Sequence, residues 1–164
     1  MNKTLSGFFI WMLVASISLC LAFADERSNI GPFKVGEKDL CPVCGMFVYK
    51  YPNWVAEIIF HDKTCAFFDG AKDMFKYYFD LRKYNPKKTK DDIVSVWVTD
   101  YYTTKLIDGK KAFYVVGSDV LGPMGHELIP HKTEKAAKSF MKDHGGKRIC
   151  GFDEVDINLI ESLR

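Results

Sequence analysis

The sequence has no marked excess of charge of either sign. Its 164 residues include 23 lysines and arginines against 21 aspartates and glutamates, which gives a formal net charge of +2. A protein that binds nucleic acid needs a basic face to neutralise phosphates. The densest basic run, residues 82–90, contains Asn85 and Pro86 and is typical of a solvated loop. Charge therefore gives no indication of a nucleic-acid partner.

The sequence also has no apolar run as long as the roughly 20 residues that a membrane-spanning helix needs. Its longest apolar stretch, residues 8–21, is preceded by Lys3 and interrupted by two serines. Ala22-Phe23-Ala24 follows, with small residues at the spacing that signal peptidase requires. We therefore predict that residues 1–24 are a cleaved signal peptide of an exported protein. An uncleaved N-terminal anchor is the alternative.

Cys20 lies at the end of this apolar stretch, where a lipid can be attached. Lipoprotein signals carry a small residue immediately before the cysteine, whereas this chain has Leu19. Cleavage after Ala24 is therefore favoured, and lipidation at Cys20 stays open. Membrane attachment is expected only if Cys20 is lipidated or the signal segment is not cleaved.

The rest of the chain has the composition of a globular protein, with 48% hydrophobic and 27% charged residues. Residues 25–37 are polar and contain Gly31, Pro32 and Gly36, which predicts a flexible lead-in. Residues 38–104 then show the pattern of a β-β-α-β unit. The expected elements are strands at 47–49 and 54–60, a helix over 67–78 and a strand at 93–99. Asp62 or Thr64 is expected to cap the helix, with Asp69, Lys72, Asp73 and Lys76 on its polar side.

Residues 105–164 repeat the same order and add a C-terminal helix. The expected elements are strands at 112–116 and 127–129, a helix around 136–141, a strand at 147–150 and a last helix capped by Asp153. Gly145-Gly146 should end the first of these helices, because a residue of positive φ is needed there.

The two halves align without gaps when Lys63-Thr64 is placed on Lys132-Thr133. We therefore predict an α+β fold of two related β-β-α-β units, which pack together because each alone is small. A coincidental match between two short amphipathic helices is the alternative.

Four cysteines remain once Cys20 is set aside: Cys41, Cys44, Cys65 and Cys150. An even number in an exported protein is consistent with two structural disulfides. A bridge between Cys41 and Cys44 would close a very small loop, which stabilises little and is more typical of redox or metal chemistry. Pairing of Cys65 with Cys44 or with Cys150 stays open.

An oxidoreductase and a zinc site are two further interpretations of Cys41-Pro-Val-Cys44. A thioredoxin-like enzyme places its first cysteine at a helix N-terminus directly after a strand. Here no strand pattern precedes the motif, and Gly45 and a strand pattern follow it. A zinc site would use Cys65 as third ligand and His61 as fourth. The second C-x2-C or H-x3-H pair of a zinc knuckle is missing, which weakens this interpretation.

Met46, two residues after Cys44, adds a donor that zinc does not favour. Thioether sulfur is a good ligand for Cu(I), and it needs no deprotonation. On an extended backbone, side chains at i and i+2 point to the same side, so Cys44 and Met46 would meet one ion. The motif therefore predicts a Cu(I) site at Cys44 and Met46, with Cys41 beside them. Simple packing is the alternative for Met46.

A second group of soft and imidazole donors lies in the second half. Met124 and His126 are again at i and i+2, and His131 follows closely. Pro123-Met124-Gly125 predicts an exposed tight turn. Met124, His126 and His131 are therefore candidate copper ligands, with a solvated loop as the alternative.

Together these motifs resemble the NosL family, accessory proteins of nitrous oxide reductase that handle copper in the periplasm. The resemblance rests on Cys41-x-x-Cys44-Gly45-Met46, on Pro123-Met124-Gly125 and on residues 136–140 followed by two glycines, and it covers residues 38–150. It implies a periplasmic Cu(I) chaperone that is not an enzyme. Its partner would be nitrous oxide reductase or another copper-handling protein.

The resemblance also implies site residues. Cys44 and Met46 fall on the family's Cu(I) motif, with Cys41 beside them, and Met124 falls on its second motif. A histidine ligand is expected among His61, His126 and His131. Residues 41–65 are also similar to the TRASH and YHS metal-binding modules, which adds Cys65 as a candidate. An exported thiol–disulfide oxidoreductase and a structural zinc or disulfide module are the competing functions.

Overall fold

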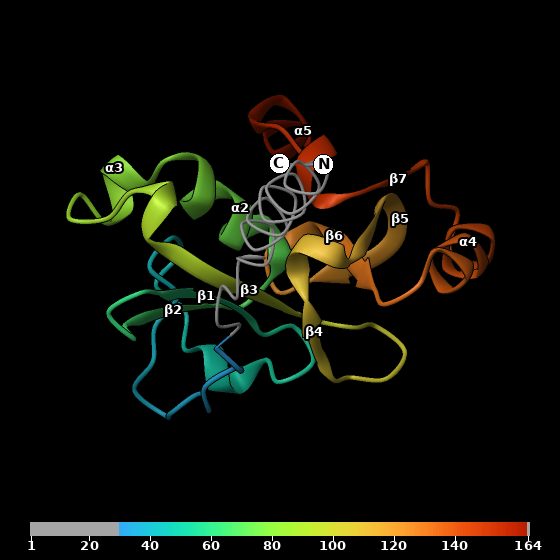
Figure 1. Cartoon of the computed structure of the whole chain (residues 1–164). Helices are drawn as coiled ribbons and strands as arrows, with labels where there is room; N and C mark the ends of the chain where they lie inside the picture. Colours follow the sequence, from blue (N-terminus) through green and yellow to red (C-terminus); the bar gives the residue numbers. More distant parts are fainter. Residues whose placement is uncertain (1–29, 164) are drawn as a thin grey trace, which may run out of the picture.

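The structure is a computed structural model that describes residues 30–163 (Figure 1). The predicted signal peptide and Cys20 lie outside the described residues. The chain forms two antiparallel sheets with helices packed against them, so the predicted α+β class is confirmed. Within residues 30–163, each helix is too short or too polar to cross a bilayer.

The first sheet has the strand order β2-β1-β3-β4. Its strands are β1 (Ala56–Phe60), β2 (Cys65–Phe68), β3 (Ile93–Thr99) and β4 (Leu106–Asp108), and α2 (Ala71–Phe79) and α3 (Leu81–Tyr84) connect β2 to β3. All five residues of β1 are buried, which explains its position inside the sheet. β4 lies at the edge of this sheet, although its residues follow the predicted unit boundary after residue 104.

The second sheet has the strand order β6-β5-β7. Its strands are β5 (Phe113–Gly122), β6 (Gly125–His131) and β7 (Arg148–Cys150), with α4 (Glu134–Asp143) between β6 and β7 and α5 (Ile157–Ser162) after them. Short 3-10 turns are η1 (Val48–Lys50), η2 (Lys90–Asp92), η3 (Gly109–Lys111) and η4 (Phe152–Glu154).

The two units share one topology. In each, the first strand is central and lies between the second strand and the strand that follows the helix, as β2-β1-β3 and β6-β5-β7 show. Both first strands pair antiparallel with both neighbours. The prediction of two related β-β-α-β units is therefore confirmed.

Within the first unit, two predicted elements were wrong. Residues 47–49 are not a strand: a single bridge joins Phe47 to Leu40, and η1 follows. Residues 65–68 form β2 rather than the start of the helix, which begins only after Gly70. Pairing with the buried strand β1 outweighs the helical spacing of the phenylalanines.

This change also displaces the predicted alignment of the two units. Asp62 and Thr64 do not cap a helix, because the Asp62 carboxylate accepts the Thr64 backbone N–H inside the β1–β2 turn. Lys63 has a φ of 65° at that turn. The equivalent helices therefore begin after Gly70 and Thr133, so Lys63 does not correspond to Lys132.

The second unit follows its prediction closely. Apart from Ala112, which follows η3, the expected strands at 112–116 and 127–129 are confirmed within the longer β5 and β6, and the expected helix and closing strand are α4 and β7. Gly145 has a φ of +64° just after α4, as expected for a residue that ends a helix. The last helix is capped by Asp156 rather than Asp153, because Asp153 lies in η4.

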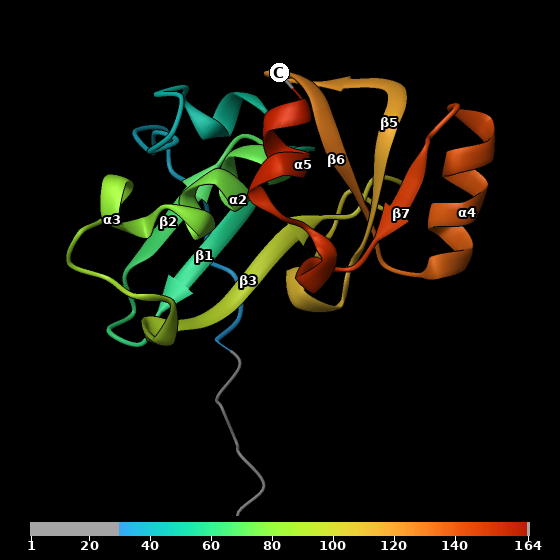
Figure 2. The same ribbon diagram turned by 90° about the horizontal axis from the view of Figure 1, so that it is seen from above.

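Two apolar clusters fill the interior. Figure 2 shows α2 and α5 between the first sheet and the β5–β6 hairpin, and α4 on the far side of the second sheet. In the larger cluster, the ring centroid of Phe75 on α2 lies 5.2 Å from that of Tyr114 and 4.9 Å from that of Phe152. The smaller one packs Val115 of β5 under α4 with Phe140. Both faces of the second sheet are therefore covered.

The described part of the lead-in is held against the first sheet, which differs from the flexible segment predicted. Ser95 Oγ and Trp97 Nε1 donate hydrogen bonds to the Ile30 carbonyl, at 2.9 and 3.0 Å. The Phe33 N–H donates to the buried Glu57 carboxylate at 3.1 Å. The start of the described chain is therefore fixed in place over β1 and β3.

Candidate metal centre

The Cys41–Met46 loop is a tight turn closed by backbone hydrogen bonds. The Cys41 N–H donates to the Met46 carbonyl at 2.8 Å, and the Gly45 N–H donates to the Cys41 carbonyl at 2.9 Å. Gly45 has a φ of +78°, a conformation that residues with a side chain rarely adopt. The backbone is therefore not extended between Cys44 and Met46, and the geometric premise of the predicted pair does not hold.

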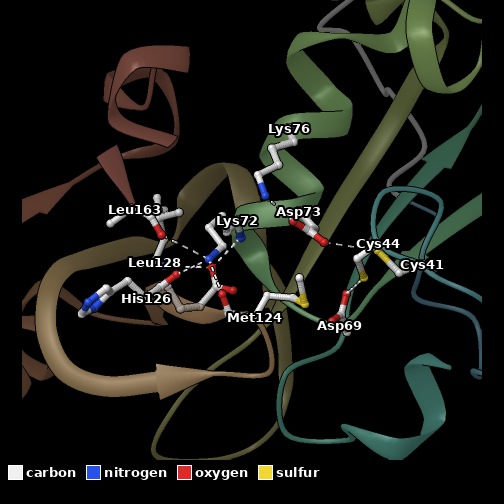
Figure 3. A network of polar contacts seen from close by, with 11 residues as sticks. Cys41, Cys44, Asp69, Lys72, Asp73, Lys76, Met124, His126, Leu128 and Leu163 are labelled. Atoms are coloured by element: carbon white, nitrogen blue, oxygen red, sulfur yellow. Dashed lines mark hydrogen bonds and ion pairs between the residues drawn. The ribbon is translucent and has the colours of Figure 1, made fainter. Parts of the chain in front are cut away.

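The loop places both thiols against the start of α2. Cys44 Sγ donates to Asp69 Oδ1 at 3.1 Å, and Cys41 Sγ donates to Asp73 Oδ2 at 3.7 Å. One ligand atom from each of these four residues lies within 4.8 Å of the other three. Figure 3 shows this arrangement, which we name the thiol–carboxylate cluster (Cys41, Cys44, Asp69 and Asp73). Cys41 is buried, whereas Cys44 is half-buried.

Asp69 and Asp73 were missed as site residues, because the sequence placed them on the solvated side of a helix. Both are buried, with 1% and 2% exposed. Lys76 Nζ contacts Asp73 Oδ1 at 2.9 Å, while Asp69 Oδ2 has no hydrogen-bond partner within residues 30–163. The sequence feature that could have identified them as site residues is a pair of carboxylates four residues apart, directly after a strongly apolar strand.

Met124 belongs to the second unit but points toward this cluster. Gly122 pairs with Gly125, so Pro123 and Met124 form the tip of the β5–β6 hairpin, and the predicted tight turn is confirmed. Met124 is 46% exposed, and its side chain extends toward Asp69 and the cysteines (Figure 3). Lys72 Nζ of α2 donates to the Met124 carbonyl at 2.8 Å.

Met46 lies in the cysteine loop and is half-buried. Its Sδ accepts a hydrogen bond from the Tyr51 hydroxyl at 3.7 Å. The thioether is therefore near the cluster in sequence, and a weak contact with Tyr51 holds it. Rotation of the side chain would release the sulfur, because a methionine has three freely rotating bonds.

The three candidate histidines lie away from the cluster. His61 is exposed in the β1–β2 turn. The His126 imidazole points away from the cysteines in Figure 3. His131 is fully buried among Tyr101, Tyr102 and Phe140, and burial lowers its pKa to about 4.

The other two described cysteines are also separate from the cluster. Cys65 lies on β2, where burial raises the pKa of its thiol to about 11 and the nearby Glu57 carboxylate adds to the effect. The Cys150 thiol is buried and donates to the Tyr114 carbonyl. Within residues 30–163 all four cysteines are free thiols.

Comparison with known protein families matches almost all of the described chain. The model of the NosL family matches residues 32–160, which include both sheets and the cluster. The chain belongs to the NosL family. The resemblance recognised in the sequence motifs is thereby confirmed.

Individual relatives agree with the NosL assignment. The copper-binding lipoprotein NosL of Stutzerimonas stutzeri is 27% identical over 153 residues, which cover 92% of this chain and 79% of that protein. The crystal structure of the copper chaperone NosL from Shewanella denitrificans has a TM-score of 0.67 at 23% identity, covering 78% of this chain and 97% of that one. This chain therefore has the NosL fold. The solution structure of apo-NosL from Achromobacter cycloclastes has a TM-score of 0.46 at 23% identity, covering 64% and 87%.

The electrostatic surroundings of this NosL site keep the thiols protonated. Burial raises the pKa of Cys41 to about 11, and the neighbouring Asp69 adds to the effect. Burial and Asp69 also raise the pKa of Cys44 well above its usual range. A redox-active cysteine needs the opposite, a lowered pKa and a stable thiolate. A bound cation would instead displace the thiol protons and balance the carboxylates.

We expect slow alkylation of these thiols at neutral pH. A pKa of about 11 in place of the ordinary 9.0 reduces the thiolate fraction of Cys41 at pH 7 by about 100-fold. The alkylation rate should therefore rise about tenfold per pH unit from pH 7 toward pH 10. Mass spectrometry of peptides after timed iodoacetamide quenching measures this, with glutathione as the unperturbed control. Rapid labelling of Cys41 or Cys44 at pH 6 would instead indicate an activated redox thiol.

Proposed function

We propose that this protein is an exported chaperone that carries one Cu(I) ion in the thiol–carboxylate cluster. The observation that carries the proposal is the meeting of two thiols and the Met124 side chain at the start of α2. Thiolate and thioether sulfurs are the soft ligands that Cu(I) prefers. The names of the relatives, a copper-binding lipoprotein and a copper chaperone, support the same cargo.

The proposed ligands are Cys41, Cys44 and Met124, with Met46 joining after its side chain turns from Tyr51. Asp69 and Asp73 are not proposed as ligands of the soft ion, because carboxylates suit harder cations. His61, His126, His131 and Cys65 are not included, since the structure holds them elsewhere.

The proposed activity is transfer by ligand exchange and involves no catalytic step. Half-buried Cys44 and exposed Met124 leave the ion accessible to the ligands of a partner protein. The family resemblance points to nitrous oxide reductase and its copper sites as the destination, in the periplasm. The lipoprotein relative supports export, with membrane attachment through Cys20 as one form of it.

Anaerobic titration with Cu(I) in competition with a chromogenic chelator tests this function. We expect about one tightly bound ion per chain, and a melting curve of the metal-free protein that still shows a cooperative transition. Mixing the loaded protein with copper-free nitrous oxide reductase should then move copper to the enzyme. Chelator-induced unfolding would favour a structural zinc module. Reduction of insulin by the metal-free protein would favour an oxidoreductase.

A further inference from the structure

Lys72 is a buried lysine whose ammonium group joins the two units. Its side chain is only 3% exposed, although it extends from the first turn of α2. Lys72 Nζ donates to three backbone carbonyls, those of Met124 at 2.8 Å, of His126, and of Leu163 at 3.4 Å (Figure 3). Two of these carbonyls belong to the β5–β6 hairpin tip, on either side of Gly125. The ammonium group therefore fixes the hairpin tip to α2.

Glu127 makes a second attachment at the same place. Its buried carboxylate accepts the backbone N–H groups of Lys72 and Leu128, so a hairpin side chain binds the N-terminus of α2. A Cβ atom at Gly70 would collide with this carboxylate, which shows how closely the hairpin approaches the start of the helix. The contact is favourable because the first N–H groups of a helix have no acceptor within the helix.

The same turn of α2 holds the cysteine loop from the other side. Asp69 and Asp73, which bind the two thiols, lie three residues before and one residue after Lys72. The cysteine loop and the hairpin tip are thus both docked at the start of α2, and within residues 30–163 no hydrogen bond joins one to the other. Lys72 and Glu127 carry the hydrogen bonds that join the hairpin to the start of α2, and of the two Lys72 binds the Met124 carbonyl itself.

We propose that Lys72 is a positioning residue that holds the Met124 thioether over the thiol–carboxylate cluster. This inference rests on the proposed Cu(I) function. Without the ammonium group, the Met124 and His126 carbonyls lose a buried donor, and the exposed hairpin tip moves toward water to satisfy them. Met124 would then be withdrawn from the ion, while Cys41 and Cys44 stayed in place.

The test follows the Met124 ε-methyl group by NMR in protein labelled with [ε-13C]methionine. In the parent protein, Cu(I) loading should shift the Met124 methyl resonance. In Lys72→Leu that shift should vanish, and Cu(I) affinity should fall about tenfold, as in Met124→Leu. The double variant should bind no more weakly than either single variant, because both remove the same ligand.

Two matched variants separate positioning from general damage. Lys76→Leu removes a lysine one turn further along α2, whose ammonium group pairs with Asp73 and, within residues 30–163, makes no hydrogen bond to the hairpin. Val115→Ala destabilises the second unit by removing part of a buried side chain from the smaller apolar cluster, under α4. Both should keep the Met124 methyl shift. Lys72→Gln replaces Lys72→Leu in this test if the leucine variant does not fold. Its side-chain amide retains a hydrogen-bond donor, so Cu(I) should shift the Met124 methyl resonance less than in the parent protein.

The outcomes distinguish this inference from the function beneath it. An unchanged Met124 shift in Lys72→Leu, or additive losses in the double variant, overturns the role of Lys72 alone. Parent-like Cu(I) affinity in Met124→Leu overturns it as well, and leaves a site made by the thiols. Absence of Cu(I) binding by the parent protein overturns the proposed function instead.

Discussion

Replacing both Cys41 and Cys44 by serine is expected to lower Cu(I) affinity by more than about 100-fold. This exceeds the effect of changing a residue that only supports a metal ligand through a hydrogen bond. Serine hydroxyls are hard donors that stay protonated, so the cluster would lose both thiolates. The fold should remain, since each hydroxyl can donate to the carboxylate that its thiol contacts, Asp69 or Asp73. Chelator competition measures the affinity, and far-UV circular dichroism the fold.

Cys65→Ser is the matched control for this experiment, because Cys65 is half-buried like Cys44 but lies on β2 away from the cluster. Its Cu(I) affinity should equal that of the parent. A second comparison, Cys44→Ser with Met46→Leu, tests whether Met46 contributes beyond the thiols. Parent-like affinity after loss of both Cys41 and Cys44 would show that the ion binds elsewhere.

Replacing Phe75 by alanine is expected to lower the free energy of unfolding by about 3–5 kcal/mol. The ring is fully buried, and it joins α2 of the first unit to Tyr114 and Phe152 of the second. The resulting cavity would therefore weaken the contact between the units as well as the first unit itself. Urea denaturation followed by tryptophan fluorescence and by circular dichroism measures the loss.

Both probes should report one shared transition, because the larger apolar cluster extends through both units. Tyr49→Ala removes an aromatic ring of which 43% is exposed and should cost less than about 1 kcal/mol. Two separate transitions in the Phe75 variant would mean that the units fold independently.

Much of the fold could be predicted from local pattern. The strands at 93–99 and in the second unit have runs of β-branched and aromatic residues, and Gly145 marks a helix end, so each signal agrees with its surroundings. The strand Cys65–Phe68 could not be predicted this way. Its residues also fit a helical repeat, and only pairing with β1 decides between the two.

The polar side of α2 shows a different limit. Asp69, Lys72 and Asp73 have the spacing of a solvated helix face, yet they are buried. Their partners in the cysteine loop and the hairpin tip lie 25 to 54 residues away along the chain. Periodicity shows which residues share a helix face, but it does not show whether that face contacts solvent or another segment of the chain.

The site was predictable where chemistry alone identifies a ligand. Two thiols and nearby thioethers indicate a soft metal whatever the fold, so Cys41, Cys44 and Met124 could be named as candidates. That they lie together at the start of α2 could not be predicted from the sequence. The histidines could not be sorted, since imidazole serves equally as a ligand, a surface group or a core residue. His131 packs in the core, and only its three-dimensional surroundings show this.

The hydrogen bonds that close the Cys41–Met46 loop join backbone atoms and use neither a thiol nor a thioether. Such a preorganised loop loses little conformational entropy on loading, so exchange of an ion needs only side-chain rotations on the nanosecond scale. The empty and the loaded carrier would then present the same backbone surface. A recipient protein that distinguishes the two forms would then have to contact the ion and its sulfur ligands directly, because the backbone of the loop would be the same in both.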